Sequence, residues 1–369
     1  MGAAGVRLAR GVAVVGAAVA GLVALASPGG GATAAGAPGD TELEYVAMGD
    51  SYTSGPLVLP HDTTWVPQDC GQSIFNYPHL AAPAIGATRF VDVSCGSAKL
   101  DDLYEPQDGL PLDGVNAPQL LAVTATTDVV TLGMGGNDIG FTGLASDCIR
   151  FLGPPLEQPC TPGIIGGGDD EVAEKIAAVG PELGKALDDI HAKAPEAEVF
   201  VVGYPTAFPD NGVACWPYLP ILQEDLPYLL AKYKQMNAML AAQAAAHGAT
   251  YIDVYTSSIG HDACQLPAVA WVNGAVVVPP SYPAHPNQLG LANSGGVVAA
   301  AIRQRLAAVA AQPASRAGVP PGSSTSSTEV APAGRQRLPV TGSGDAAATL
   351  GLVLLVGAGI TGRLARRRA

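Results

Sequence analysis

The sequence predicts an α/β fold of three layers, in which helices cover both faces of a central, mostly parallel sheet of about five strands. Short runs rich in Val, Ile, Phe and Tyr alternate along the chain with longer segments of helical periodicity. The hydrophobic fraction is 48% and only 14% of the residues are charged, which excludes a fully disordered chain. No internal repeat is visible, so we expect one domain over residues 35–311 between two terminal segments of different composition.

The elements of this domain follow from local patterns. Five short apolar runs are expected to form buried strands, at residues 44–48, 89–94, 128–134, 198–203 and 250–254. Three longer segments carry apolar residues at helical spacing and are predicted as helices, at residues 170–193, 224–247 and 288–311. Two long stretches rich in Gly and Pro, 56–77 and 140–168, are predicted to be loop excursions above one edge of the sheet.

Residues 1–34 have the features of a secretory signal peptide. Arg7 and Arg10 precede an apolar run over residues 11–26, and Ala32-Thr33-Ala34 supplies a small-residue cleavage site. Cleavage after Ala24-Leu25-Ala26 is the alternative. An uncleaved membrane anchor is the competing interpretation, but the run is short for a bilayer span. We therefore expect an exported protein.

The other end combines three features in a fixed order. Residues 312–337 form a linker rich in Pro, Ser and Thr, and residues 338–369 contain Leu-Pro-Val-Thr-Gly, an apolar segment at 346–362 and a basic tail. This order resembles the cell-wall sorting signal read by sortases, which implies cleavage after Thr341 and attachment of Thr341 to the envelope. A plain C-terminal transmembrane helix is the alternative. In both cases the domain faces outward.

Charge and cysteine content agree with this location. Residues 35–311 hold 10 Lys and Arg against 30 Asp and Glu, a net charge of −20, which argues against binding to nucleic acid. Six cysteines in an exported chain are expected to form disulfides, and none has the C-x-x-C spacing of a zinc site. Fifteen pairings are possible. We expect nearest neighbours to pair, as Cys70–Cys95, Cys148–Cys160 and Cys215–Cys264.

Polar residues follow the predicted strands at the edge where an α/β sheet binds its ligands. Gly49-Asp50-Ser51 follows the first strand, Cys95-Gly96-Ser97 the second and Gly135-Gly136-Asn137-Asp138 the third. His285 stands just before the last predicted helix. A nucleophile, a base and several donors at one edge are what acyl transfer requires.

These motifs resemble those of the SGNH (GDSL) hydrolases over roughly residues 44–310. GDSYTSG matches the G-D-S-x-x-x-G block, GGND matches the G-x-N-D block, and His285 matches the closing histidine block. The chain is most similar to the secreted esterases and lipases of that family that carry three disulfides. The resemblance implies a flavodoxin-like α/β/α sandwich. We expect no cofactor and no metal, because the acidic residues lack a ligand loop such as D-x-D-x-D-G and ester hydrolysis by a serine needs no ion.

The resemblance also assigns roles. It implies that Ser51 is the nucleophile, His285 the general base and Asn137 an oxyanion donor, with a further donor from the Ser51 N–H. Thr53 and Ser54 are rivals of Ser51 that we expect to bond to the local backbone instead. Asp50 and Asp138 are expected to order their loops through backbone hydrogen bonds rather than to act in catalysis.

Two positions depart from the family pattern. The family often has Asp three residues before the histidine, where this chain has Tyr282. We therefore expect the backbone carbonyl of Tyr282 to orient His285, with Asp262 as an alternative. The family commonly has Gly where this chain has Ser97, preceded by Gly96. Either backbone N–H could serve the oxyanion, and we expect that of Ser97.

The sequence thus predicts a monomeric serine esterase or lipase, displayed on the cell wall with sortase as its processing enzyme. The resemblance to the lipolytic branch favours fatty acyl esters over the alternative, acetyl esters of carbohydrates. A second alternative is a surface binding module that keeps the fold but has weak catalysis.

Overall fold

The central element of the computed structural model, which describes residues 42–274 and 280–311, is a five-stranded sheet whose strands all run parallel. The strands are β1 (Glu44–Gly49), β2 (Arg89–Asp92), β3 (Val129–Gly133), β4 (Glu198–Val202) and β5 (Thr250–Ile252). Their order is β2-β1-β3-β4-β5, which is the flavodoxin-like order. The predicted fold class and all five predicted strands are confirmed.

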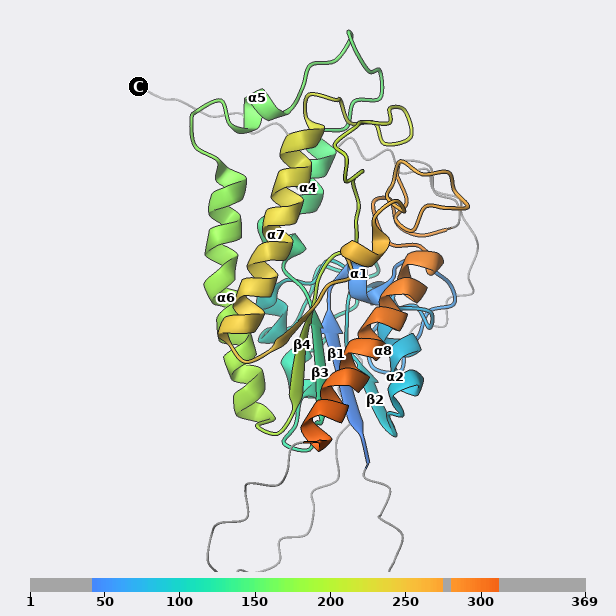
Figure 1. The fold of residues 1–369 in the computed structure, drawn as a ribbon, viewed down its shortest axis with the longest axis vertical. Helices are drawn as coiled ribbons and strands as arrows, with labels where there is room; N and C mark the ends of the chain where they lie inside the picture. The colour runs from blue at the N-terminus through green and yellow to red at the C-terminus, as the bar shows by residue number, and fades with distance from the viewer. Residues whose placement is uncertain (1–41, 275–279, 312–369) are drawn as a thin grey trace, which may run out of the picture. The chain divides into compact units, whose positions relative to one another are not determined.

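Two layers of helices cover the sheet (Figure 1). The pair α6 (Glu171–Lys193) and α7 (Leu226–Ala246) packs on one face, and the pair α2 (Tyr77–Ile85) and α8 (Gln288–Ala310) packs on the other. Along β1 the side chains alternate between the two cores, as the pleat of a strand requires: Val46 and Met48 face the α6–α7 side, whereas Tyr45 and Ala47 face the α2–α8 side. Burial on both faces explains why the strands are continuous apolar runs.

The three predicted helices are present as α6, α7 and α8, and two have clear start signals. The Asp170 side chain accepts a hydrogen bond from the N–H of Ala173, and the Asn287 side chain accepts from the N–H groups of Leu289 and Gly290. The shorter elements are α1 (Ser51–Ser54), α3 (Gly136–Ile139), α4 (Phe141–Asp147), α5 (Thr161–Ile164), η1 (Gln68–Cys70), η2 (Leu100–Leu103), η3 (Gln119–Ala122) and η4 (Thr256–Ser258).

Helix α2 was not predicted. It has only 9 residues and contains Pro78 and Pro83, which disrupt a helical pattern in the sequence. Pro78 lies in the first turn, where a missing N–H costs no hydrogen bond, and the Asn76 side chain caps the helix. The prediction that residues 140–168 form a loop excursion is wrong in part, since α4 and α5 lie within it.

Three disulfides anchor the long connections, and they are the three predicted pairs: Cys70–Cys95, Cys148–Cys160 and Cys215–Cys264. The first ties the connection after α1 to the residues that follow β2. The second closes the connection between α4 and α5, and the third joins two connections that flank α7 and β5. All three lie outside the sheet.

No helix in the described part of the chain is long and apolar enough to cross a membrane. The predicted signal peptide at 1–34, the linker at 312–337 and the sorting signal at 338–369 lie outside the described residues.

Candidate active site

Ser51 and His285 meet at the carboxyl end of β1. The Ser51 Oγ lies 2.7 Å from the His285 Nε2, although 234 positions separate the two residues in the sequence. Ser51 is the first residue of α1 and directly follows the turn at Asp50, so the strand fixes its position at the edge of the sheet. Both side chains are buried, at 9% and 6% exposure. The structure therefore brings together the two residues that the sequence predicts as nucleophile and base.

The turn that presents Ser51 requires a glycine at position 49. A Cβ atom on Gly49 would lie 2.1 Å from the Thr53 Oγ1 and 2.7 Å from the Gly133 carbonyl oxygen. Such contacts are far below van der Waals distance, so β1, β3 and α1 can approach each other only because residue 49 has no side chain. The Gly of the motif is thus a packing requirement.

The rivals of Ser51 point elsewhere. Thr53 donates from its hydroxyl to the Gly133 carbonyl at 3.1 Å, so the prediction of a bond to the local backbone is wrong: the bond reaches the end of β3 instead. The same prediction is wrong for Ser54, which is fully buried and whose hydroxyl has no hydrogen-bond partner among the described residues. Neither side chain lines the cavity next to Ser51.

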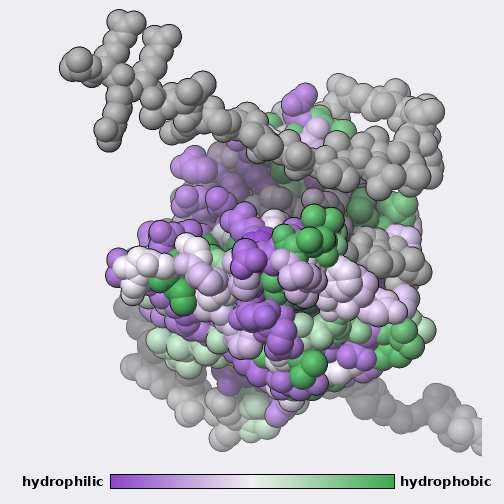
Figure 2. Space-filling model, turned by 90° about the horizontal axis from the view of Figure 1, so that it is seen from above, coloured by the Kyte–Doolittle hydropathy of each residue, from purple (hydrophilic) through white to green (hydrophobic). Residues whose placement is uncertain are grey.

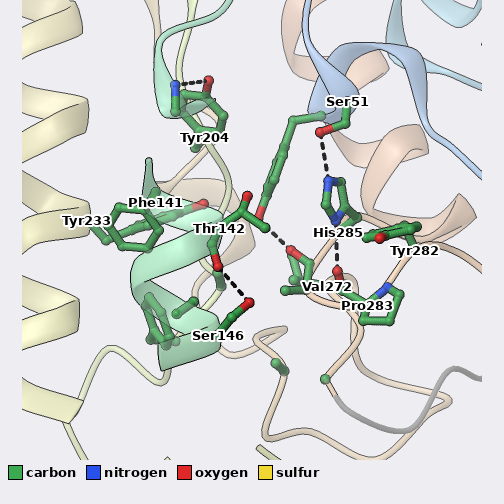
Figure 3. Close-up of a pocket in the computed structure, with 18 of the residues that line it drawn as sticks. Ser51, Phe141, Thr142, Ser146, Tyr204, Tyr233, Val272, Tyr282, Pro283 and His285 are labelled. Carbon is green, nitrogen blue, oxygen red and sulfur yellow. Dashed lines mark hydrogen bonds between the residues drawn. The ribbon is translucent and has the colours of Figure 1, made fainter. Parts of the chain in front are cut away.

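A backbone carbonyl orients His285, but it is not the predicted one. The His285 Nδ1 lies 2.8 Å from the carbonyl oxygen of Pro283 (Figure 3). A carbonyl oxygen can only accept a hydrogen bond, so Nδ1 carries the proton and Nε2 presents its lone pair to Ser51. This is the tautomer that a general base needs.

The prediction of the Tyr282 carbonyl is therefore wrong by one residue. The Tyr282 oxygen instead accepts the backbone N–H of His285 at 3.1 Å, which closes a tight turn and leaves the next carbonyl facing the ring. The alternative, Asp262, is also excluded as the partner of Nδ1. Its carboxylate accepts from the N–H of Cys264 at 2.9 Å and from the Gln265 side chain at 3.2 Å.

Burial lowers the pKa of His285 to about 4, and the hydrogen bond to the Pro283 carbonyl offsets part of this effect. Burial disfavours the imidazolium because it removes water from around the charge. No carboxylate contributes to this pKa shift. His285 is therefore a neutral base over most of the pH range.

Asn137 lines the same cavity as this pair and lies on α3, shortly after β3. Its side-chain amide lines the cavity and donates one hydrogen bond to the Ala98 carbonyl at 2.9 Å. An amide nitrogen carries two hydrogens, so a second remains for a ligand. The next residue, Asp138, accepts the N–H of Leu100 at 2.9 Å and so holds the loop after β2 against α3, the ordering role predicted for it.

The loop after β2 leaves one of its two candidate donors available. The Gly96 N–H donates to the Cys70 carbonyl at 2.9 Å and is thereby used. Ser97 adopts a φ of +65°, the left-handed conformation that favours glycine. This explains why a glycine would suit the position, and it shows that the backbone here tolerates serine.

One residue of the site, Tyr204, was missed by the sequence analysis. It follows β4, and its hydroxyl donates to the Asp50 Oδ2 at 2.5 Å while accepting the Gly136 N–H at 2.8 Å. The other Asp50 oxygen accepts the Tyr52 N–H at 2.9 Å, the backbone contact predicted for Asp50. Tyr204 thus joins the nucleophile turn to the Asn137 turn. Its position directly after a predicted strand was the signal that could have identified it.

Burial raises the pKa of Asp50 to about 7, and the hydrogen bond from Tyr204 opposes this shift. Burial disfavours the charged form of this carboxyl group, and Asp50 makes no contribution to the pKa shift of His285. Its contacts are with Tyr52 and Tyr204, as described above.

A cavity of about 280 Å³ opens beside Ser51 and His285. In Figure 3 these two residues lie on one side of it, whereas Phe141, Thr142, Ser146 and Tyr233 lie on the other. The remaining lining is mostly apolar and comes from α4, α7 and the connections after α4, before α7 and before α8: Ala145, Ile149, Ala207, Phe208, Leu219, Pro220, Ile221, Met236, Ala263 and Val272. A buried nucleophile and base thus border an apolar space.

Metal-ligating side chains are not grouped in the described part of the chain: no set of three or more His, Cys, Asp or Glu residues there is placed to hold an ion. The chemistry available from the described geometry is that of a hydroxyl, an imidazole and amide donors.

Comparison with known proteins shows which family this chain resembles. A model described as the GDSL-like Lipase/Acylhydrolase family matches residues 47–292. Lipase 2 of Streptomyces coelicolor is 38% identical over 274 residues, which cover 73% of this chain and 89% of that protein.

Two solved structures of lipolytic enzymes also align with this chain. The extracellular lipase of Streptomyces rimosus aligns with a TM-score of 0.57 at 26% identity, covering 71% of this chain and 99% of that one. Phospholipase A1 of Streptomyces albidoflavus aligns with a TM-score of 0.56 at 25% identity, with the same coverage. The similarity thus extends over nearly the whole of each of the two Streptomyces structures.

Proposed function

The chain belongs to the GDSL-like lipase and acylhydrolase family and is a hydrolase of carboxylic esters; from this premise we propose that it cleaves fatty acyl esters through an acyl-Ser51 intermediate. The observation that carries the proposal is the 2.7 Å contact between Ser51 Oγ and His285 Nε2 at the mouth of an apolar cavity. Ester hydrolysis by this route needs no cofactor.

In the acylation step, His285 Nε2 takes the proton of Ser51 as the Oγ attacks the ester carbonyl. The carbonyl oxygen becomes negatively charged in the tetrahedral intermediate. The N–H groups of Ser51 and Ser97 and the Asn137 amide are the donors that we assign to it. The intermediate collapses when the C–O bond to the alcohol breaks and His285 returns the proton to the leaving oxygen.

Deacylation repeats the same steps with water. His285 takes a proton from the water, whose oxygen attacks the acyl carbon, and the proton then returns to Ser51 as the acid leaves. The Pro283 carbonyl keeps the ring in one tautomer throughout, since its bond to Nδ1 is available in both half-reactions. A neutral carbonyl stabilises the imidazolium less than a carboxylate would, so this dyad relies more on its oxyanion donors.

The size and lining of the cavity favour a fatty acyl group. A cavity of about 150 Å³ holds one benzene molecule, so by proportion about 280 Å³ holds about eleven carbons. An acetyl group would leave most of this apolar space unfilled, which disfavours the alternative of a carbohydrate acetyl esterase. A binding module with weak catalysis is disfavoured by the intact contact between Ser51 and His285.

We also propose that the protein is exported, monomeric and held at the cell wall. The support is the signal-like segment at 1–34 and the sorting-signal pattern at 338–369, together with the extracellular lipase of Streptomyces rimosus as a structural relative. If sortase joins Thr341 to the wall, Thr341→Ala should abolish the release of the protein by wall-degrading enzymes. Unchanged release would favour anchoring by a C-terminal transmembrane helix instead.

The function is tested by hydrolysis of p-nitrophenyl esters from two to sixteen carbons with the full chain. We expect the rate to be highest at medium chain length and to fall at least about 1,000-fold in Ser51→Ala. The matched control is Ser54→Ala, which removes a buried hydroxyl three residues after Ser51 in the same motif and should leave the rate within about twofold. Activity that persists in Ser51→Ala would remove Ser51 from the mechanism, and an optimum at two carbons would favour an acetyl esterase.

A further inference from the structure

Large apolar side chains are exposed on the connections that also contribute residues to the lining of the cavity. Six of them are between 43% and 73% exposed: Phe151, Leu152, Leu156, Trp216, Tyr218 and Leu266. We call this set the apolar rim. Viewed from above, this end of the molecule shows hydrophobic patches between hydrophilic side chains (Figure 2). Soluble proteins seldom expose large apolar patches unless they bind something there.

The connections that carry the apolar rim are joined to each other. The Trp216 indole donates to the Arg150 carbonyl at 2.8 Å, and the Arg150 N–H donates to the Pro220 carbonyl at 2.7 Å. A Cβ on Gly153 would lie 2.9 Å from the Trp216 ring, so this ring packs against the backbone beside Leu152. Disulfides Cys148–Cys160 and Cys215–Cys264 secure the same connections. The connections that carry the exposed side chains are therefore held in place.

The charged residues on the connections that carry the apolar rim are hydrogen-bonded to the backbone of the same connection. Arg150 and Glu157 are the charged residues of positions 148–168, and positions 211–223 and 263–274 have none. The Arg150 guanidinium donates to the carbonyls of Asp147, Ile149 and Gln158 at 2.6–2.9 Å. Glu157 accepts the N–H groups of Leu152 and Gly153 at 2.6 and 3.0 Å. A region without outward charge is unusual in a domain whose net charge is −20.

The apolar rim is continuous with the cavity. Two lining residues are close to the rim in the sequence: Leu219 directly follows Tyr218, and Ile149 lies two positions before Phe151. A third, Pro220, accepts the N–H of Arg150, the residue before Phe151. An acyl chain that leaves a lipid layer at the rim would thus meet apolar side chains along its path to Ser51. A water-soluble ester would need no such surface.

We propose that the apolar rim adsorbs to the surface of an uncharged lipid aggregate, such as zwitterionic phosphatidylcholine, from which an acyl chain enters the cavity. This proposal rests on the proposed function, because it assumes that the cavity receives a fatty acyl group. The acidic domain and the absence of outward cations on the rim disfavour an anionic membrane.

The test measures co-sedimentation of the full chain with phosphatidylcholine vesicles, in a Ser51→Ala background that leaves the lipid intact. We expect Leu156→Asp to lower the vesicle-bound partition at least about tenfold, because it places a charge in the lipid layer, and Phe151→Asp to act likewise. The control is Val309→Asp, an exposed aliphatic residue near the end of α8, which should not change the partition. The terminal segments are common to all variants. Equal partition of Leu156→Asp and its parent would overturn the proposal.

Two further measurements separate the possible outcomes. With Ser51 restored, Leu156→Asp should hydrolyse dissolved p-nitrophenyl acetate at the parental rate, because Leu156 does not line the cavity. If the parent fails to hydrolyse any ester, the proposed function fails whatever the partition shows. If sedimentation velocity shows that Leu156→Asp converts a dimer to a monomer, the rim binds a second copy of the chain and the lipid proposal is wrong.

Discussion

Different interactions fix the residues in the two walls of the cavity. On the polar wall, Ser51, His285 and Asn137 are each fixed by specific hydrogen bonds, to His285, Pro283 and Ala98. On the apolar wall, Tyr233 packs edge to face against Phe141 and Phe208, with ring centroids 5.2 and 5.6 Å apart. Hydrogen bonds require particular atoms at particular positions, whereas packing requires volume and shape. In the proposed mechanism, the first wall therefore determines which reaction occurs, and the second determines which acyl group fits.

The largest effect after loss of the nucleophile should come from Asn137 on the polar wall. Asn137→Ala removes a donor to the oxyanion and should lower kcat roughly 100- to 1,000-fold with little change in KM, because the donor matters most in the transition state. Steady-state kinetics on a soluble ester measure this. Asn293→Ala, which removes a surface amide bonded to Ser257, is the control. A loss confined to KM would mean that Asn137 binds substrate instead.

The pH dependence tests whether His285 lacks a charged partner. His285 acts as a base only when neutral, and its pKa is lowered to about 4, so activity should persist as the pH falls and halve near pH 4. At pH 5 such a base is about 90% neutral, whereas one with the ordinary pKa of 6.5 is about 3% neutral, roughly a thirtyfold difference in rate.

Unfolding must be separated from this titration. The unfolded chain binds a proton at His285 near pH 6.5 and the folded one only near pH 4, so this residue lowers stability as the pH falls between these values. At each pH, kcat/KM should therefore be determined from initial rates, and circular dichroism should show that the protein is still folded. A midpoint of 6 to 7 in a protein that remains folded would contradict the neutral environment of His285.

On the apolar wall, a larger side chain should change selectivity and leave the chemistry intact. Ala145 lines the cavity from α4, and Ala145→Phe should lower activity on ten-carbon esters roughly tenfold while activity on acetyl esters stays within about twofold. The control is Gly143→Phe on the same helix, where a Cβ would meet nothing within 4 Å. An equal loss for all chain lengths would show that the two walls are not independent.

The smallest effect is expected at Ser97, where only the backbone matters to the proposed chemistry. Ser97→Gly relieves a left-handed backbone conformation and should change the free energy of unfolding by about 0.5–1 kcal/mol in favour of the folded state. Activity should not change, since glycine keeps the N–H. Denaturant unfolding and ester hydrolysis measure the two quantities. A large loss of activity would mean that the Ser97 hydroxyl takes part.

The difference between the walls also explains what could be predicted from the sequence. The strand pattern gave the fold, and the three motifs located Ser51, Asn137 and His285 because only certain side chains can do this chemistry. The Pro283 carbonyl was missed by one residue because every residue carries a carbonyl, so the sequence contains no trace of which one faces the ring. Phe141, Phe208 and Tyr233 were not identified, because apolar residues in a core and in a cavity wall have the same composition.

The acceptor at Pro283 changes how this site could be lost. In a triad that uses a side-chain carboxylate, a single nucleotide change can erase the third member. Here the third member is a main-chain oxygen, which every substitution at position 283 retains. Only a change that reshapes the turn, for instance at Ala284 with its φ of +59°, could turn that oxygen away. Loss of the group that orients His285 therefore depends on the conformation of this loop and not on the identity of one side chain.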